Sequence, residues 1–137
     1  IEFRRMKLWR LAGAWLLGGL AAAPLQAQTP GRVWVTPPPG DAARGKLLYE
    51  SRCVACHSVD EHRTGPAHRG VVGRRLGSAA GYGYSRELAA SRLRWTSQTL
   101  NAWLADPEEL IPGQRMGFQV DDATDRADLI SWLATLR

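Results

Sequence analysis

The sequence predicts an all-α domain whose helices are joined by long loops. Apolar residues near the C-terminus, Leu129, Ile130, Leu133 and Leu136, recur at the 3.6-residue spacing of a helix. No segment shows the period-two alternation that is typical of a half-buried strand. Residues 58–83 hold six glycines and little apolar periodicity, so we expect them to form a loop.

The first predicted helix covers residues 42–53. Asp41 is a suitable N-cap, because its carboxylate can accept hydrogen bonds from the unpaired amides of the first turn. The segment is rich in Ala, Arg, Lys, Leu and Glu, which are good helix formers. Gly45 in the helix interior costs about 1 kcal/mol relative to alanine. We therefore expect another helix to approach closely at Gly45.

The second half of the chain is predicted to contain two helices and a loop. Thr96 is a candidate N-cap for the first helix, and Pro107 lies just beyond its end, where a helix stop is expected. The apolar face of this helix consists of Leu100, Trp103 and Leu104. In chain order, the predicted elements are a helix at 97–105, a short turn at 108–110, a loop at 111–118 and a helix from 122–124 to about 136.

The two cysteines of the chain lie in the segment Cys53-Val54-Ala55-Cys56-His57. This Cys-x-x-Cys-His pattern is typical of a covalent haem c attachment site. Two residues between the cysteines allow both sulfurs to reach the two vinyl groups on one edge of a porphyrin. His57 then lies under the ring centre, where its imidazole can bind iron. The motif predicts one covalently attached haem and an electron-carrying role.

Three other uses of the cysteine pair remain open from the motif alone. A structural disulfide would give no reason for the adjacent histidine. A structural zinc site usually needs four ligands, and no second cysteine pair exists. A thioredoxin-like dithiol needs a βαβ context, for which the sequence offers no strand pattern.

The N-terminal segment has the three-part layout of a secretory signal peptide. A basic start at Met6 is followed by an apolar stretch over 11–23 and by small or neutral residues before a cleavage point after Ala27. The apolar stretch is shorter than the ~20 residues that span a bilayer. The alternative is an uncleaved segment that tethers the protein to a membrane. Cleavage would place the protein in the periplasm, and covalent haem attachment of this kind occurs outside the cytoplasm.

The remaining boundaries follow from composition. Residues 1–5 precede the start methionine and resemble an expression scar or upstream read-through, and 6–27 are the predicted signal peptide. Residues 28–39 include four prolines and are predicted to be a flexible leader. Residues 40–137 form the predicted folded domain, which is short enough that a covalent haem would add substantially to its core.

The charge of the chain does not call for nucleic acid as a partner. The formal charge is +5, but the first 27 residues hold four of the basic residues and only one acidic residue, so the remainder carries +2. The basic pairs Arg74-Arg75 and Arg92/Arg94 are better explained as solvated faces than as a polynucleotide site.

Met116 is the candidate for the second axial ligand. It is the one methionine after Ala27, and it lies in a Pro/Gly loop rather than on a helix face. A thioether suits haem iron opposite histidine, and this pairing raises the reduction potential. A packing role for Met116 is the alternative, and His62 and His68 are rival ligands. His62 is close to His57 in sequence and poorly placed to reach the opposite haem face, whereas His68 lies in a segment expected on the proximal side.

Over residues 40–136 the chain resembles the class I c-type cytochromes, which include mitochondrial cytochrome c and bacterial cytochrome c2. The resemblance rests on the attachment motif and on five further segments: Thr64-Gly65-Pro66, Gly73-Arg74, Gly81 to Ser85 with Trp95, Leu110 to Phe118 around Met116, and Arg126 to Leu133. It implies a fold in which the N- and C-terminal helices cross and loops wrap one covalent haem. In this family the crossing involves a glycine and an aromatic pair, here Gly45 and Tyr49 with Leu129 and Trp132.

The resemblance also implies a role for each site residue. His57 and Met116 would be the iron ligands, and the carbonyl of Pro66 would accept a hydrogen bond from His57. Arg74, Tyr84 and Trp95 would hold the haem propionates, and Phe118 would lie at the exposed haem edge. The cofactor-binding residues implied in this way are Cys53, Cys56, His57, Pro66, Arg74, Tyr84, Trp95 and Phe118.

Three positions depart from the mitochondrial pattern. Trp103 stands where a tyrosine is common, Gln114 where a threonine is usual, and Leu88 where an asparagine is usual. A lysine-rich rim is also missing, because Lys46 is the one lysine after residue 40. Neither the reduction potential nor the docking electrostatics of the mitochondrial protein can therefore be carried over.

The expected function is that of a single-haem, one-electron carrier between periplasmic or membrane redox enzymes, not an enzyme. Its partners would be redox proteins that dock at the exposed haem edge, and it would be a monomer or a small subunit of a redox complex. It would have no membrane span after signal cleavage. Two enzymatic alternatives remain, a haem peroxidase and the haem subunit of a periplasmic dehydrogenase.

Overall fold

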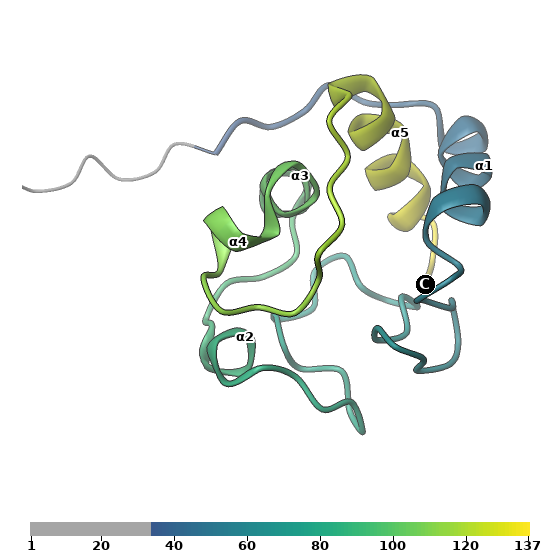
Figure 1. Ribbon diagram of the computed structural model, residues 1–137. Coiled ribbons are helices and arrows are strands. Elements are labelled where there is room, and N and C mark those ends of the chain that lie inside the picture. Colours follow the sequence, from purple (N-terminus) through teal and green to yellow (C-terminus); the bar gives the residue numbers. More distant parts are fainter. Residues whose placement is uncertain (1–33) are drawn as a thin grey trace, which may run out of the picture. The chain divides into compact units, whose positions relative to one another are not determined.

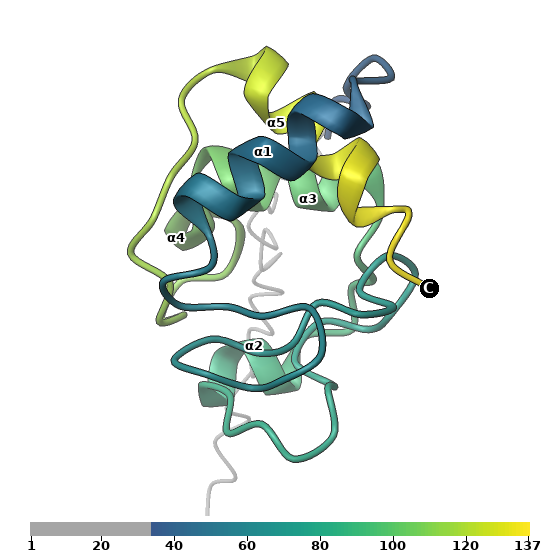
Figure 2. The same cartoon turned by 90° about the vertical axis from the view of Figure 1, so that its right-hand side faces the viewer.

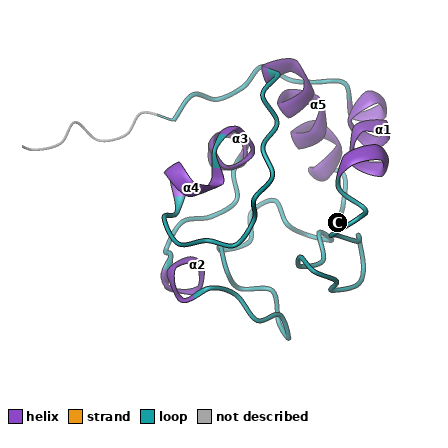
Figure 3. Cartoon of the chain, viewed as in Figure 1, coloured by secondary structure: helices purple, strands orange, loops and turns teal. Residues whose placement is uncertain are grey.

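Five helices joined by loops make up the part of the chain that the computed structural model describes, residues 34–137 (Figures 1 and 3). No strand occurs within 34–137, where Arg75 and Arg94 form an isolated bridge. The all-α prediction is confirmed. The helices are α1 (Ala42–Arg52), α2 (Arg86–Ala90), α3 (Ser97–Ala105), α4 (Pro107–Leu110) and α5 (Ala123–Leu133).

The start of α1 is fixed by the predicted cap. The carboxylate of Asp41 accepts hydrogen bonds from the backbone amides of Ala43, at 2.8 Å, and Arg44, at 3.2 Å. The helix ends at Arg52, one residue before the predicted end, and Cys53 is its C-cap. The attachment motif therefore begins at the point where the chain leaves α1.

The helices α1 and α5 cross against each other, as Figure 2 shows. Gly45 makes this approach possible, because a β-carbon there would lie 2.0 Å from the carbonyl oxygen of Asp128 and 3.0 Å from the β-carbon of Trp132. The rings of Tyr49 and Trp132 pack beside this point with centroids 4.3 Å apart. Both the expected close approach at Gly45 and the crossing of the terminal helices are confirmed.

The predicted helix at 97–105 is found with the same bounds as α3. Thr96 and Thr99 form a reciprocal capping box, in which each side chain accepts from the backbone amide of the other residue. The predicted turn at 108–110 is the short helix α4, which starts at Pro107. The helix α2 was not predicted, because five residues are too few to show a period.

The last helix is shorter than predicted. It ends at Leu133 rather than near Leu136. Beyond it the chain forms turns in which the amides of Thr135 and Leu136 donate to the carbonyls of Trp132 and Leu133. The carbonyl of Leu136 then accepts from the amide of Gly70, at 2.7 Å, so the C-terminal segment binds the long loop.

The loop over 58–83 has no helix, as predicted, and is held by backbone hydrogen bonds to distant segments. Its amides at Gly73 and Leu76 donate to the carbonyls of Trp95 and Leu93, at 2.7 and 2.9 Å. Leu76 is fully buried. These contacts join the loop to the segment between α2 and α3.

The predicted segments 1–5 and 6–27, and the start of the predicted leader, lie outside the described residues. The described part of the leader, residues 34–39, has no regular secondary structure. Trp34 packs against the core, and the hydroxyl of Thr36 accepts a hydrogen bond from Gln98 of α3, at 2.6 Å. Within 34–137 none of the helices has the length and apolarity that crossing a membrane requires.

Candidate functional site

A cavity of about 590 Å³ lies between the helices and the loops. Its wall is mostly apolar and includes side chains from α3, α5 and the loop after α4. Every site residue that the sequence predicted contributes to this wall. They are Cys53, Cys56, His57, Pro66, Arg74, Tyr84, Trp95, Met116 and Phe118.

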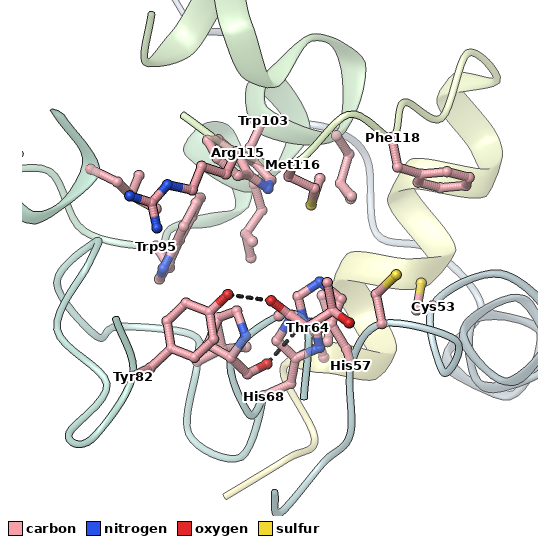
Figure 4. Close-up of a pocket in the computed structure, with 18 of the residues that line it drawn as sticks. Cys53, His57, Thr64, His68, Tyr82, Trp95, Trp103, Arg115, Met116 and Phe118 are labelled. Atoms are coloured by element: carbon pink, nitrogen blue, oxygen red, sulfur yellow. Dashed lines mark hydrogen bonds between the residues drawn. The ribbon is translucent and has the colours of Figure 1, made fainter. Parts of the chain in front are cut away.

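Met116 and His57 approach the cavity from opposite sides. Figure 4 shows the thioether of Met116, with Arg115 and Phe118, on one side, and the ring of His57, with Thr64 and His68, on the other. The loop over 111–118 carries Met116 and follows α4 directly. A flat group in the cavity would therefore have His57 on one face and Met116 on the other.

The ring of His57 is oriented by its backbone neighbours. Nδ1 of His57 lies 2.9 Å from the carbonyl oxygen of Pro66, so this nitrogen carries the proton and Nε2 is left as the lone-pair donor. Burial lowers the pKa of His57, and the hydrogen bond to Pro66 acts in the opposite direction. The neutral imidazole is the form that binds metal.

Gly65 also fits closely against this histidine. A β-carbon on Gly65 would lie 2.1 Å from Cε1 of His57, so only glycine allows the backbone to pass the ring at this distance. Its amide donates to the carbonyl of Cys56, at 2.7 Å, which ties the loop to the attachment motif.

Both cysteines line the cavity, and no disulfide joins them. Cys53 is partly buried and Cys56 is exposed. Burial, followed by the nearby Cys56, raises the pKa of Cys53 to about 11 although Arg52 acts to lower it. The buried sulfur is thus uncharged at neutral pH, and it would stay uncharged as a thioether.

The part of the cavity wall that holds Arg74 and Tyr84 is suited to an anionic group. Arg74 donates from its terminal nitrogens to the carbonyls of Ala67 and Arg69, both at 3.1 Å, but its buried Nε has no hydrogen-bond partner among the described residues. The hydroxyl of Tyr84 accepts from the amide of Ala79, at 3.3 Å, and burial raises the pKa of Tyr84. A buried guanidinium N–H that lacks a partner fits a haem propionate at this position.

The rival histidines are engaged elsewhere. Nε2 of His62 lies 2.8 Å from the carbonyl oxygen of Ala80, and its Nδ1 accepts from the amide of Ala67, at 3.0 Å. His68 stacks on the ring of His57, with centroids 4.2 Å apart. Neither histidine faces His57 across the cavity, as Met116 does.

Three contacts at the site were not predicted from the sequence. Tyr82 lines the cavity, and its hydroxyl donates to the carbonyl of Thr64. The side-chain carbonyl of Gln114 accepts from the amide of Met116. Trp103 packs edge-on against Trp95, with centroids 5.3 Å apart. The contacts of Tyr82 and Trp103 depend on tertiary placement, for which the sequence pattern carries no signal, whereas the contact of Gln114 lies within the loop over 111–118.

Comparison with known proteins identifies the family. The family model for cytochrome c matches residues 42–137. Cytochrome c of Gossypium barbadense is 39% identical over 70% of this chain and 90% of its own length. Cytochrome c2 of Rhodopila globiformis is 38% identical over 73% of this chain and 97% of its own length. The structure of cytochrome cH from Methylobacterium extorquens is similar, with a TM-score of 0.67 and 40% identity over 70% of this chain and 99% of that one. The chain therefore belongs to the cytochrome c family, with one haem c attached covalently through Cys53 and Cys56, and is an electron-transfer protein.

Proposed function

We propose that the chain is a one-electron carrier whose haem iron is six-coordinate, with His57 and Met116 as axial ligands. The observation that carries this proposal is the placement of Met116 and His57 on opposite sides of one cavity (Figure 4). The haem supplies a one-electron Fe(III)/Fe(II) couple. Pro66 orients His57, and Arg74, Tyr84 and Trp95 bind the propionates.

Ligation on both faces leaves no open position on the iron for peroxide or O₂. Such a site changes little in geometry when an electron arrives, which suits a carrier better than a peroxidase. A soft thioether opposite histidine also stabilises the reduced iron and raises the potential.

The test is a visible spectrum of the protein produced in a host that attaches haem. We expect a c-type reduced spectrum and, in the ferric form, the weak far-red band of methionine-bound iron. Met116→Ala should abolish this band and give a high-spin ferric form, whereas Met116→His should abolish the band but keep the iron low-spin.

Val120→Ala is a suitable control, because Val120 is buried but does not line the cavity. It should lower stability and keep the far-red band. Persistence of the band in Met116→Ala would refute methionine ligation.

We propose that redox partner proteins dock where the motif and the methionine loop reach the surface. Val54 is 38% exposed and Phe118 is 43% exposed, and Cys56 is exposed beside them. Contacts of this kind are small and short-lived. The proposed form is a monomer, and stable co-purification with a dehydrogenase would instead assign it as a subunit.

We also propose export to the periplasm with cleavage after Ala27. The support is the basic start, the apolar stretch and the small residues at the cleavage point. N-terminal sequencing of the haem-containing protein from a periplasmic fraction should begin at Gln28. Recovery of the intact N-terminus in the membrane fraction would support the tethered form.

A further inference from the structure

Two partly buried imidazole rings lie face to face in this protein. The rings of His57 and His68 are stacked, with centroids 4.2 Å apart and an angle of 20° between their planes. His68 lies on the same side of the cavity as His57 (Figure 4). Neither the proposed ligation nor haem attachment needs a second imidazole here.

The position of His68 is fixed from two directions. Its backbone amide donates to the carbonyl of Ser58, at 3.0 Å, and the next amide, of Arg69, donates to Val59, at 2.8 Å. These two carbonyls belong to the residues that follow His57 directly. The backbone pairing therefore sets the spacing between the two rings.

The ring of His68 is also held by its side chain. Its Nδ1 lies 3.0 Å from the hydroxyl of Tyr49, and the two rings meet edge-on with centroids 5.6 Å apart. Tyr49 is 2% exposed in α1 and packs on Trp132 of α5. A continuous contact thus runs from the helix crossing through Tyr49 and His68 to His57.

A partly buried imidazole is a costly way to fill space. Burial of a polar ring is unfavourable unless its hydrogen bonds are made, and an aliphatic side chain would fill the volume without this cost. Burial, followed by the nearby His57 and Arg74, lowers the pKa of His68 to about 3. What the imidazole offers beyond an aliphatic chain is a flat face.

We propose that His68 is a positioning residue that sets the rotation of the His57 ring about the bond from Nε2 to the iron. The hydrogen bond to Pro66 restrains one edge of His57, and the stacked face of His68 restrains the plane of the ring. Groups around a ligating histidine that fix its orientation also tune the metal. This inference rests on the proposed function, because it takes His57 as an iron ligand.

The test uses His68→Leu, which fills the volume without a flat face, and His68→Phe, which restores one. The plane of an axial imidazole sets the rhombicity of the ferric EPR signal and the order of the four haem-methyl shifts in the proton NMR spectrum. We expect His68→Leu to change both, and to alter the equilibrium constant for reduction by about threefold or more. His68→Phe should return the methyl order to that of the wild type.

Two further variants distinguish a change in the orientation of the His57 ring from a loss of stability. Val120→Ala should destabilise the protein and leave the EPR and methyl pattern unchanged. Tyr49→Phe removes one hydroxyl and frees Nδ1 of His68, so it should shift the methyl pattern in the same direction as His68→Leu but less.

Each failure has its own signature. A folded His68→Leu variant with the wild-type EPR and methyl pattern would overturn the proposal. If His68→Leu does not fold, Tyr49→Phe is the deciding variant. An unchanged haem-methyl pattern in Tyr49→Phe would then overturn the proposal. A high-spin ferric spectrum of the wild type would instead refute axial ligation by His57 and Met116, which is a failure of the proposed function.

Discussion

The α-carbon of Gly45 lies so close to α5 that a β-carbon on it would be 2.0 Å from the carbonyl oxygen of Asp128. The two helices therefore meet backbone to backbone, and no rotation of a side chain can relieve a substitution at this point. The crossing also carries Tyr49, which reaches His68 beside His57.

Gly45→Ala should destabilise the protein by about 1–3 kcal/mol, because the new methyl group forces α1 and α5 apart. This loss would outweigh the gain of about 1 kcal/mol in helix propensity. Denaturant unfolding followed by far-UV circular dichroism measures the change. Leu47→Ala is the matched control in the same helix, since Leu47 is 66% exposed and its replacement should stay within about 0.5 kcal/mol. Equal stabilities of Gly45→Ala and the wild type would contradict the close approach.

The three-residue network of Asp125, Arg44 and Arg52 should make stability depend on pH. Burial acts to raise the pKa of Asp125, but hydrogen bonds from the two arginines outweigh it and hold the pKa below the ordinary value of 3.8. A lowered pKa in the folded state means that the charged form stabilises the fold above about pH 3.8. This contribution is lost as the pH falls through the folded-state pKa.

Asp125→Asn isolates this effect, because Asn has the shape of the protonated acid. At pH 7 the variant should unfold at a lower temperature than the wild type, and the gap should narrow as the pH falls below 3.8. Thermal unfolding at a series of pH values measures the gap. A gap that is constant with pH would show that the charge of Asp125 adds nothing.

Helix ends that are set by nearby residues could be predicted from the sequence. The caps Asp41 and Thr96 each bond amides within three residues, so α1 and α3 were found within one residue of their bounds. The C-terminal end of α5 was missed by three residues. Beyond Leu133 the chain forms turns, and Leu136 accepts from the amide of Gly70, a tertiary bond that apolar periodicity cannot show.

The candidate site also has a part that the sequence predicts and a part that only the folded structure shows. The attachment motif and the methionine loop are contiguous in sequence, and all nine predicted residues line one cavity. The stack of His68 on His57 and the contact between Tyr82 and Thr64 join residues 11 and 18 positions apart through loops without a period. No local pattern specifies such contacts, so they emerge only from the folded chain.

Glu108 and Gln114 should stabilise the loop that presents Met116. Glu108 accepts from the amide of Gly113, at 2.8 Å, and from the side chain of Gln114, at 3.3 Å, while Gln114 in turn accepts from the amide of Met116. Gln114→Ala removes the last two contacts. The hydrogen bond to the Met116 amide contributes about 0.5–1.5 kcal/mol, so its loss alone should let added imidazole displace Met116 about 2- to 13-fold more readily.

The measurement is an imidazole titration of the ferric protein, followed through the loss of the far-red band. Glu61→Gln changes an exposed acidic residue outside the cavity wall and should leave the imidazole affinity unchanged. An unchanged affinity in Gln114→Ala would mean that the loop is held by other contacts.

Arg74 should raise the reduction potential through its charge. Its buried Nε lacks a partner among the described residues, and its charge near a propionate would stabilise the reduced haem. Arg74→Gln should lower the midpoint potential, on the order of tens of millivolts. Arg74→Lys keeps the charge, so its midpoint potential should lie between those of Arg74→Gln and the wild type. The control is Arg92→Gln, at an exposed position outside the cavity wall, which should leave the potential unchanged. A potential in Arg74→Gln equal to that of the wild type would refute this role.

Arg115 tests where electrons leave the protein. It is exposed, lines the cavity, and is the charged side chain of the loop over 111–118. Figure 4 shows it on the Trp95 side of Met116, and its guanidinium donates to the carbonyl of Gly83, at 3.4 Å. At low salt, charges are felt over tens of ångströms, so Arg115 should attract an anionic oxidant and repel a cationic one. In Arg115→Glu, the rate with ferricyanide should fall about two- to fivefold and the rate with tris(phenanthroline)cobalt(III) should rise.

Arg92→Glu makes the same change of charge at an exposed position outside the cavity wall and should alter both rates much less. Because the two reagents carry opposite charges, a fall in both rates would indicate damage to the haem site. Equal effects of Arg115→Glu and Arg92→Glu would show that electrons do not leave through the surface around Arg115.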